Sequence, residues 1–139
     1  MTLSEHRGNV FFTQGDPYYA HCIASDLRMG AGIAVEFQHR FGLRGKLLDS
    51  GKILRSPTCV LIRKVFNLIT KRSSSGKPSY NSIRMAIRKM GELIGEHGVE
   101  RIAMPRIGCG LDGLSWAVVR QILLEELGKT GITIEVYKL

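Results

Sequence analysis

Two glycine-rich segments of the chain have the composition of anion-binding loops. Residues 28–34 read RMGAGIA, and residues 105–113 read PRIGCGLDG. Glycines let backbone N–H groups approach a phosphate closely, and a helix that begins at such a loop adds a partial positive charge. A single segment of this kind indicates little more than a tight turn. Two of them in a short chain, each followed by an amphipathic stretch, predict that a diphosphate is held between them.

A lysine and an aspartate lie where they could act on a ligand held in this way. Lys71 ends an apolar run that predicts a strand, and α/β sheets bind ligands beyond the carboxyl ends of their strands. An amine at that place could act as a nucleophile. Asp112 lies inside the second glycine-rich segment, where its carboxylate could take a proton from water or from a sugar hydroxyl. The simpler interpretations are a solvated lysine and an aspartate that caps the next helix.

Other reactive side chains are weaker candidates. Cys109 lies between two glycines and could be a reactive thiol, but no histidine is adjacent to it, which favours close packing against a ligand. His21 lies within a predicted strand, which favours a core histidine. Arg106 could contact a phosphate or only solvent. The three cysteines are scattered and form no C-x-x-C pair, so we expect no metal site, no disulfide and no cofactor.

The second glycine-rich segment also matches the G-x-G-x-x-G pattern at Gly108, Gly110 and Gly113. Only 26 residues follow Gly113, enough for one helix and one strand. A dinucleotide-binding fold built forward from this loop is therefore excluded. The complete G-x-x-x-x-G-K-[ST] pattern of a P-loop is absent as well. Any nucleotide must be held in a different way.

The elements that position these residues follow from hydrophobic periodicity and turn chemistry. The sequence predicts strands at residues 10–13, 18–24, 53–54, 58–62, 65–69, 99–104 and 132–137, and helices at residues 32–41, 79–97 and 115–127. In the second half of the chain strands and helices alternate, which is typical of parallel βαβ units with helices on both faces of a sheet. The predicted class is α/β, with residues 1–8 as an N-terminal extension and residues 9–139 as one domain.

Length and composition bound the possible functions. The chain has 139 residues, of which 44% are hydrophobic and 23% charged, as in a soluble single-domain protein. No apolar run approaches the roughly 18 residues that a membrane span requires, and the first ten residues lack the apolar segment of a signal peptide. We therefore expect an intracellular protein, cytoplasmic or nuclear, that has no membrane partner and is a monomer.

Basic residues are concentrated in one part of the chain. From Arg40 to Lys89 there are 13 basic residues and a single acid, Asp49, whereas the net charge of the whole chain is +8. Such a block attracts polyanions, including nucleic acid and nucleotides. The alternative is a solvated basic surface that only keeps the protein soluble.

Four segments together carry a resemblance to a known family. The motifs HCI at residues 21–23, RMGAGIAV at 28–35, LITK at 68–71 and MPRIGCGLD at 104–112 resemble macrodomain ADP-ribosyl glycohydrolases. These include terminal ADP-ribose protein glycohydrolases and the related bacterial DNA ADP-ribosyl glycohydrolases. The resemblance extends over residues 9–139. It implies a macrodomain, a three-layer α/β/α sandwich with a mixed central sheet, that binds ADP-ribose with its diphosphate between the two glycine-rich loops.

The resemblance also implies an activity. ADP-ribose would be hydrolysed from a modified acidic side chain or from a nucleic-acid base, as in reversal of ADP-ribosylation during the DNA damage response. In this family a lysine after the I-T pair attacks C1″ of the distal ribose and forms a covalent intermediate, and an aspartate after G-C-G-L is the acid/base. These roles fall on Lys71 and Asp112. Deacylation of O-acyl-ADP-ribose would be compatible with the same pocket.

The ligand contacts that the resemblance implies are spread along the chain. They are Asp16, Pro17, Ala24, Met29, Gly30, Ala31, Gly32, Ile33, Thr70, Pro105, Arg106, Ile107, Gly108, Cys109, Gly110, Leu111 and Leu139. Two of these positions depart from the family pattern. Pro17 has no N–H to donate to adenine, and Ala24 stands where the family has a serine. We expect these departures to affect affinity more than chemistry.

Three functions therefore remain open at this point. The first is a glycohydrolase acting on ADP-ribosylated protein, or on ADP-ribosylated DNA that is bound through the basic block between Arg40 and Lys89. The second is a non-catalytic reader of ADP-ribose. The third is a basic nucleic-acid-binding module whose affinity falls steeply with salt and does not depend on the glycine-rich loops.

Overall fold

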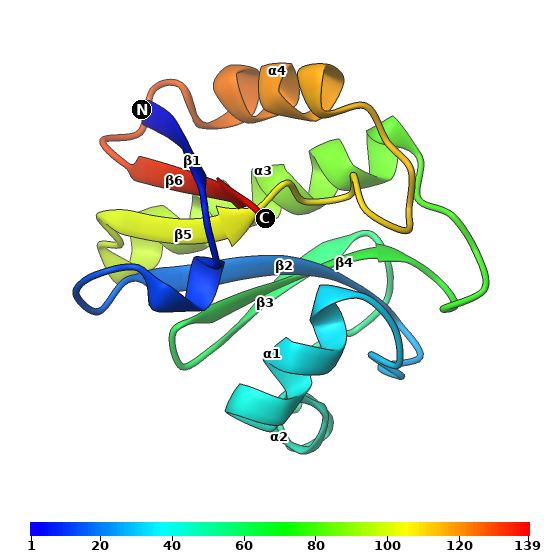
Figure 1. The fold of residues 1–139 in the computed structure, drawn as a ribbon. Coiled ribbons are helices and arrows are strands. Elements are labelled where there is room, and N and C mark those ends of the chain that lie inside the picture. Colours follow the sequence, from blue (N-terminus) through cyan, green and yellow to red (C-terminus); the bar gives the residue numbers. More distant parts are fainter.

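A six-stranded sheet forms the middle layer of the protein in a computed structural model that describes residues 1–139 (Figure 1). The elements, in chain order, are β1 (Thr2–Arg7), the 3-10 helix η1 (Val10–Phe12), β2 (Tyr18–Ala24), α1 (Ile33–Phe41), α2 (Leu43–Asp49), β3 (Thr58–Ile62), β4 (Val65–Lys71), α3 (Tyr80–His97), β5 (Arg101–Pro105), α4 (Trp116–Leu127) and β6 (Thr133–Lys138). No helix is long and apolar enough to cross a membrane.

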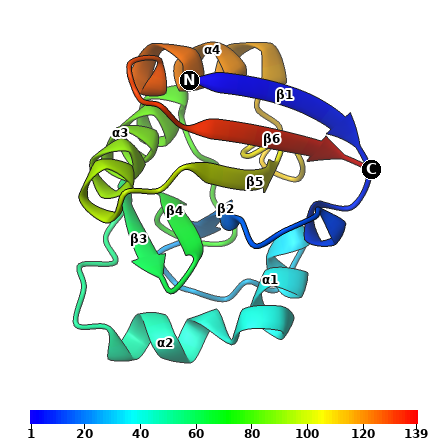
Figure 2. The same cartoon turned by 90° about the vertical axis from the view of Figure 1, so that its left-hand side faces the viewer.

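The strand order is β1-β6-β5-β2-β4-β3, and every neighbouring pair is parallel except β3 with β4. Helices α3 and α4 cover one face of the sheet, and α1 and α2 lie on the other (Figures 1 and 2). The predicted three-layer α/β/α sandwich with a mixed sheet is confirmed. Because β2, β4, β5 and β6 run in the same direction, the segments that follow them emerge at one edge of the sheet.

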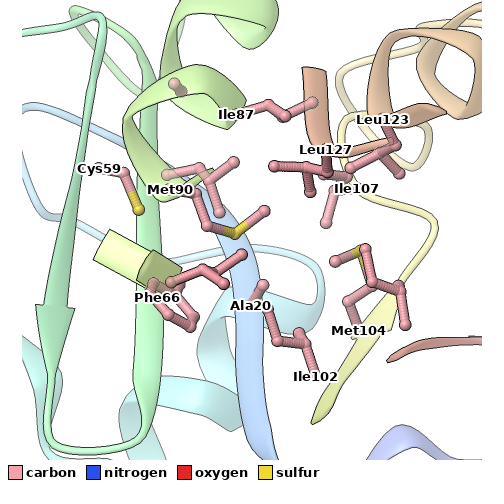
Figure 3. Packing of buried hydrophobic residues seen from close by; sticks show 14 of the residues in the cluster. Ala20, Cys59, Phe66, Ile87, Met90, Ile102, Met104, Ile107, Leu123 and Leu127 are labelled. Carbon is pink, nitrogen blue, oxygen red and sulfur yellow. The ribbon is translucent and has the colours of Figure 1, made fainter. Parts of the chain in front are cut away.

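Two apolar cores hold the layers together, one on each face of the sheet. The larger core packs α3 and α4 against the sheet, and Figure 3 shows Met90 of α3 between Ile87 of the same helix and Phe66 of β4. The smaller core packs Phe37 of α1 and Leu47 of α2 against the opposite face. All five of these side chains are fully buried. The helices therefore fix the positions of the loops that connect them to the strands.

The structure differs from the predicted elements mainly in the N-terminal half. Residues 10–13 form no strand: Val10–Phe12 is a 3-10 helix that Asn9 caps by accepting a hydrogen bond from the N–H of Phe11 at 2.9 Å. Residues 53–54 belong to no strand, and the helix α2 was not predicted from the sequence. Residues 1–8, treated above as an extension, contain β1, which pairs with β6 along its whole length.

His21 is part of the core, as its position in a strand predicted. Its ring stacks on Phe37 with 4.2 Å between ring centroids, and its Nε2 lies 2.7 Å from Oδ1 of Asn67. The Asn67 amide nitrogen already donates to the carbonyls of Val60 and Val65, so Asn67 offers an acceptor and Nε2 carries the proton. Nδ1 has no partner, and burial lowers the pKa of His21 to about 4.

This buried imidazole should make stability depend on pH. Protonation of His21 occurs near pH 6.5 in the unfolded chain and near pH 4 in the folded one, so the unfolded state binds the extra proton between these values. The free energy of unfolding should fall on acidification across that window by about 1.4 kcal/mol per pH unit from this group. Urea unfolding of the wild type and of His21→Gln at pH 7, 6 and 5 measures the slope, which should be shallower in the variant.

The matched control for that experiment is His97→Gln, which removes an exposed imidazole at the end of α3. It should leave the pH slope of the wild type unchanged. If His21→Gln retains the wild-type slope, the buried histidine does not titrate in the way described.

Candidate functional site

A cleft of about 1460 Å³ lies at the edge of the sheet where the parallel strands end. Its wall includes Ala24 at the end of β2, Lys71 at the end of β4, Pro105 at the end of β5 and Lys138 at the end of β6. Open α/β sheets bind ligands at this edge because the loops that leave the strands can diverge there. Both glycine-rich segments line the cleft.

Lys71 and Asp112 meet in this cleft. The Lys71 Nζ lies 2.7 Å from Oδ1 of Asp112, although the two residues are 41 positions apart in the chain. Their side chains are only 14% and 15% exposed, so the pair is largely shielded from water. At this distance a proton can pass directly from the ammonium to the carboxylate. An amine and a carboxylate in this arrangement are chemically able to act as a nucleophile and the base that activates it.

The loop that follows Lys71 holds this pair from one side. Lys71 Nζ also donates to the carbonyl of Ser74 at 3.4 Å. The carboxylate of Asp26 accepts hydrogen bonds from the N–H and the hydroxyl of Ser74, both at 2.7 Å, and from the N–H of Arg28. Burial acts to raise the pKa of Asp26, but these hydrogen bonds outweigh it and hold the pKa below its usual value. Asp26 therefore stays ionised and ties this loop to the first glycine-rich segment.

A side chain from α2 fixes the backbone of the first glycine-rich segment. Leu27 and Met29 have φ angles of 58° and 47°, which are unusual for residues with a side chain. The guanidinium of Arg44 donates to the carbonyl of Leu27 at 2.6 Å and to that of Arg28. Gly32 precedes α1 with φ 62°, a conformation that favours glycine. The N–H groups of the segment are thereby held at the wall of the cleft.

The second glycine-rich segment is shaped by close packing. A Cβ atom on Gly108 would lie 2.8 Å from Cδ1 of Ile83 and 3.1 Å from Cδ1 of Leu114, so a larger residue would force these side chains to shift, and the φ of 72° also favours glycine. Leu111 reaches across the cleft, because a Cβ on Gly32 would lie 3.3 Å from its Cδ1. Lys77 Nζ donates to the Leu111 carbonyl at 2.5 Å. The two glycine-rich segments therefore approach each other from opposite sides of the cleft.

The end of the cleft beside β6 is built by the turn after β1. Gly8, Asn9 and Val10 line it together with Tyr137 and Lys138. The N–H of Gly8 donates to the carbonyl of Lys138 at 2.9 Å, which continues the pairing of β1 with β6. This end lies three strands away from Lys71, since β5 and β2 separate β6 from β4.

Most residues predicted to contact a ligand do line the cleft. Besides Lys71 and Asp112, these are Ala24, Met29, Gly30, Ala31, Gly32, Ile33, Pro105, Arg106, Ile107, Gly108, Cys109, Gly110, Leu111 and Leu139. Thr70 does not: it is 2% exposed within β4.

Asp16 and Pro17 are not part of the cleft either, which corrects the place expected for them. They precede β2 and therefore lie at the amino end of that strand, at the opposite edge of the sheet. Asp16 forms an ion pair with Lys64 at 2.8 Å, and its side chain is 87% exposed. The missing N–H of Pro17 consequently has no bearing on the cleft.

Other residues of the cleft wall are not among the predicted ligand contacts. Asn9 and Val10 follow a glycine just as Asp16 and Pro17 do, and this second glycine–polar turn was the signal that could have indicated them. Ser74 and Lys77 belong to a polar loop directly after Lys71, and their closeness to it in the chain was the available signal.

The cysteines near the cleft are protonated thiols. Burial raises the pKa of Cys109 to about 11, although Arg106 opposes this effect. Burial also raises the pKa of Cys22, and the charge of Asp112 adds to the shift. A protonated thiol is a poor nucleophile, so Lys71 is the better candidate. No group of three or more His, Cys, Asp or Glu side chains could hold a metal ion.

The basic block between Arg40 and Lys89 does not form one free cationic surface. Six of its 13 basic side chains are in ion pairs, namely Arg40, Lys64, Lys71, Arg84, Arg88 and Lys89. Three more, Arg44, Lys46 and Lys77, donate to backbone carbonyls. Most of the charge that the sequence concentrates here is thus used within the protein.

Comparisons with known proteins agree with this architecture. A family model described as Macro domain matches residues 20–123. The ADP-ribose glycohydrolase OARD1 of Bos taurus is 39% identical over 137 residues, which cover 96% of this chain and 89% of that protein.

Two solved structures share the fold. The macrodomain of Thermus aquaticus DarG superposes with a TM-score of 0.82 at 24% identity and 99% coverage of both chains. Thermosipho africanus DarTG in complex with ADP-ribose superposes with a TM-score of 0.84 at 22% identity, covering 98% of this chain and 41% of that one. The chain, with its α/β/α sandwich and the two glycine-rich loops at the edge of its sheet, belongs to the macro domain family.

Proposed function

We propose that the protein is a hydrolase that binds ADP-ribose and releases it from a modified acidic side chain. The observation that carries the proposal is the Lys71–Asp112 pair, 2.7 Å apart and shielded from water, beside two glycine-rich loops. A protein that only bound ADP-ribose would have no use for a partly buried nucleophile and base in contact. The relative named ADP-ribose glycohydrolase OARD1, which matches 96% of this chain, supports the same activity.

The lining of the cleft supports one direction for bound ADP-ribose. Its diphosphate would lie between the two glycine-rich segments, where backbone N–H groups and the start of α1 are available. Its distal ribose would then reach Lys71 and Asp112 at the end of β4. Its adenosine would extend the other way, toward the turn of Asn9 and Val10 beside β6.

In the proposed reaction every proton has a donor and an acceptor among Lys71, Asp112, water and the leaving carboxylate. Asp112 takes a proton from the Lys71 ammonium, and the neutral amine attacks C1″ of the distal ribose. The bond between C1″ and the carboxylate oxygen breaks, that oxygen takes the electron pair and the proton from Asp112, and a lysyl–ADP-ribose intermediate remains. Water then attacks C1″ while Asp112 takes its proton. The C1″–N bond breaks, its electron pair returns to the amine, and the amine recovers the proton from Asp112.

The group that carries ADP-ribose could also be a nucleic-acid base. Lys52, Arg55, Arg63 and Arg72 are the basic side chains between Arg40 and Lys89 that have no ion pair or hydrogen bond within the protein. Arg72 adjoins Lys71 in sequence and is the one of the four next to the proposed reaction site. This supports nucleic acid as a second class of substrate, held by few contacts to phosphate.

Lys71→Ala and Asp112→Ala should each lower the rate of ADP-ribose release from a glutamate-modified peptide by at least about 10²-fold. Intact mass spectrometry of quenched wild-type reactions should show an ADP-ribose adduct that Lys71→Ala lacks. Lys52→Ala, which removes an exposed lysine far from the pair in the chain, should retain the wild-type rate. Wild-type turnover by either site variant would refute the mechanism, and ADP-ribose binding without any release would make the protein a reader.

Gly32→Ala should weaken ADP-ribose binding at least about tenfold. The added Cβ demands an unfavourable φ and lies 3.3 Å from Leu111, so the loop must shift away from the diphosphate. Gly51→Ala is the matched control, because Gly51 also has a positive φ of 68° and has open space around it. Calorimetric titration with ADP-ribose should find unchanged affinity for Gly51→Ala, and equal losses in both variants would count against the placement of the diphosphate.

Binding of unmodified single-stranded DNA should depend only weakly on salt. The four unpartnered cations of the basic block contribute no more than about −3 to the slope of log affinity against log salt, at about −0.7 for each phosphate contact. If all 13 basic residues acted as one surface, the slope would approach about −9. Fluorescence anisotropy between 50 and 300 mM salt measures it, and a slope near the second value would show that the ion pairs described above open for DNA.

A further inference from the structure

A second, smaller cavity of about 220 Å³ adjoins the cleft at the end beside β6. It lies between β1, β6 and the segment that follows β5, and it is lined by Glu5, His6, Arg7, Arg106, Val136 and Lys138. Arg106 and Lys138 line the cleft as well. A ligand in the cleft could therefore extend into this cavity.

Two like charges lie side by side in the lining of this cavity. Arg7 of β1 and Lys138 of β6 are directly paired in the register of the two parallel strands. Side chains at paired positions point to the same face of a sheet, and like charges at such positions destabilise it. Neither side chain forms an ion pair or a hydrogen bond within the protein. An anion between them would remove this repulsion.

The single acid of the cavity is already compensated. The carboxylate of Glu5 accepts hydrogen bonds from Trp116 Nε1 at 2.9 Å and from Arg106 at 3.3 Å, and it pairs with Arg120 at 3.3 Å. The Nε of Arg106 is nevertheless buried without a partner. The cavity therefore contains three cationic side chains against one carboxylate, and that carboxylate is shared with a fourth cation.

We propose that this cavity binds a phosphate group carried by the adenosine ribose of the ligand, either directly or through a further ribose. The proposal rests on the proposed function, because that function places adenosine at the β6 end of the cleft. The volume is several times the roughly 30 Å³ that one water molecule occupies, so a phosphate group fits. Arg7 and Lys138 supply two free cations for it, and Arg106 supplies an unused N–H at the border with the cleft. The phosphate is either a 2′-phosphate monoester or a phosphate of the next unit of an ADP-ribose chain, which is joined to the 2′-oxygen through its own ribose.

Calorimetric titration of the wild type with ADP-ribose and with 2′-phospho-ADP-ribose tests the proposal. The additional phosphate should lower Kd about tenfold, as expected for charge-assisted hydrogen bonds. Arg7→Glu should abolish this gain and Arg7→Lys should retain most of it, while the Kd for ADP-ribose itself stays within about twofold in both variants. Arg7 is chosen because it lines the small cavity and not the cleft.

A charge-matched control distinguishes binding of the phosphate at this cavity from general electrostatic attraction by the protein. Lys129→Glu changes the net charge by the same amount as Arg7→Glu at an exposed position after α4. It should leave the gain from the phosphate intact. Equal losses in the two variants, or no gain in the wild type, would overturn the proposal. Failure of ADP-ribose itself to bind would instead overturn the proposed function and this inference with it.

Calorimetric titration with a third ligand, two linked ADP-ribose units, distinguishes the two sources of the phosphate. If it gains affinity over ADP-ribose and Arg7→Glu removes that gain, the cavity accepts the next unit of a chain. If only 2′-phospho-ADP-ribose binds more tightly than ADP-ribose, the cavity selects a terminal 2′-phosphate.

Discussion

The contact between Lys71 and Asp112 is the interaction on which the rest of the site depends. An ion pair that is largely removed from water costs desolvation free energy, and it is favourable only when both partners are held in good geometry. Each partner is therefore held by its own segment: Lys71 by the ladder of β4, Asp112 by the packed turn around Gly108. The sheet and the large core thus act together to keep Lys71 Nζ and Asp112 Oδ1 2.7 Å apart.

The backbone around this pair adopts conformations that its own residues do not favour. Leu27 and Met29 have positive φ angles, and the carbonyls of that turn are held by Arg44 from a helix on the other side of the segment. Asp26 in the same turn holds Ser74. Side chains that never face the cleft therefore fix the N–H groups and carbonyls that do, which is how a rigid scaffold can present strained loops.

Lys71 and Asp112 could be chosen as candidates from the sequence because the features that mark them are local: strand ends and glycine-rich turns can be recognised without knowing which strands pair. The end of the cleft beside β6, in contrast, depends on contacts between residues that are far apart in the sequence. Two glycine–polar turns lie seven residues apart, Gly8-Asn9 and Gly15-Asp16, and only the pairing of β1 with β6 decides which one reaches the cleft. β1 is an edge strand with a mostly polar sequence, and α2 is short and contains Gly45, so neither gives a strong hydrophobic pattern.

The distribution of charge in the folded protein is also difficult to predict from the sequence. A count along the chain marks residues 40–89 as the basic region, yet helices bring Glu125 and Glu126 of α4 against Arg84 and Arg88 of α3 and neutralise part of it. The reverse occurs at β1 and β6, where Arg7 and Lys138 are far apart in sequence and outside that region, and the sheet sets them side by side. The electrostatic field that a ligand meets is decided by strand register and helix packing, and the composition of a sequence window does not determine it.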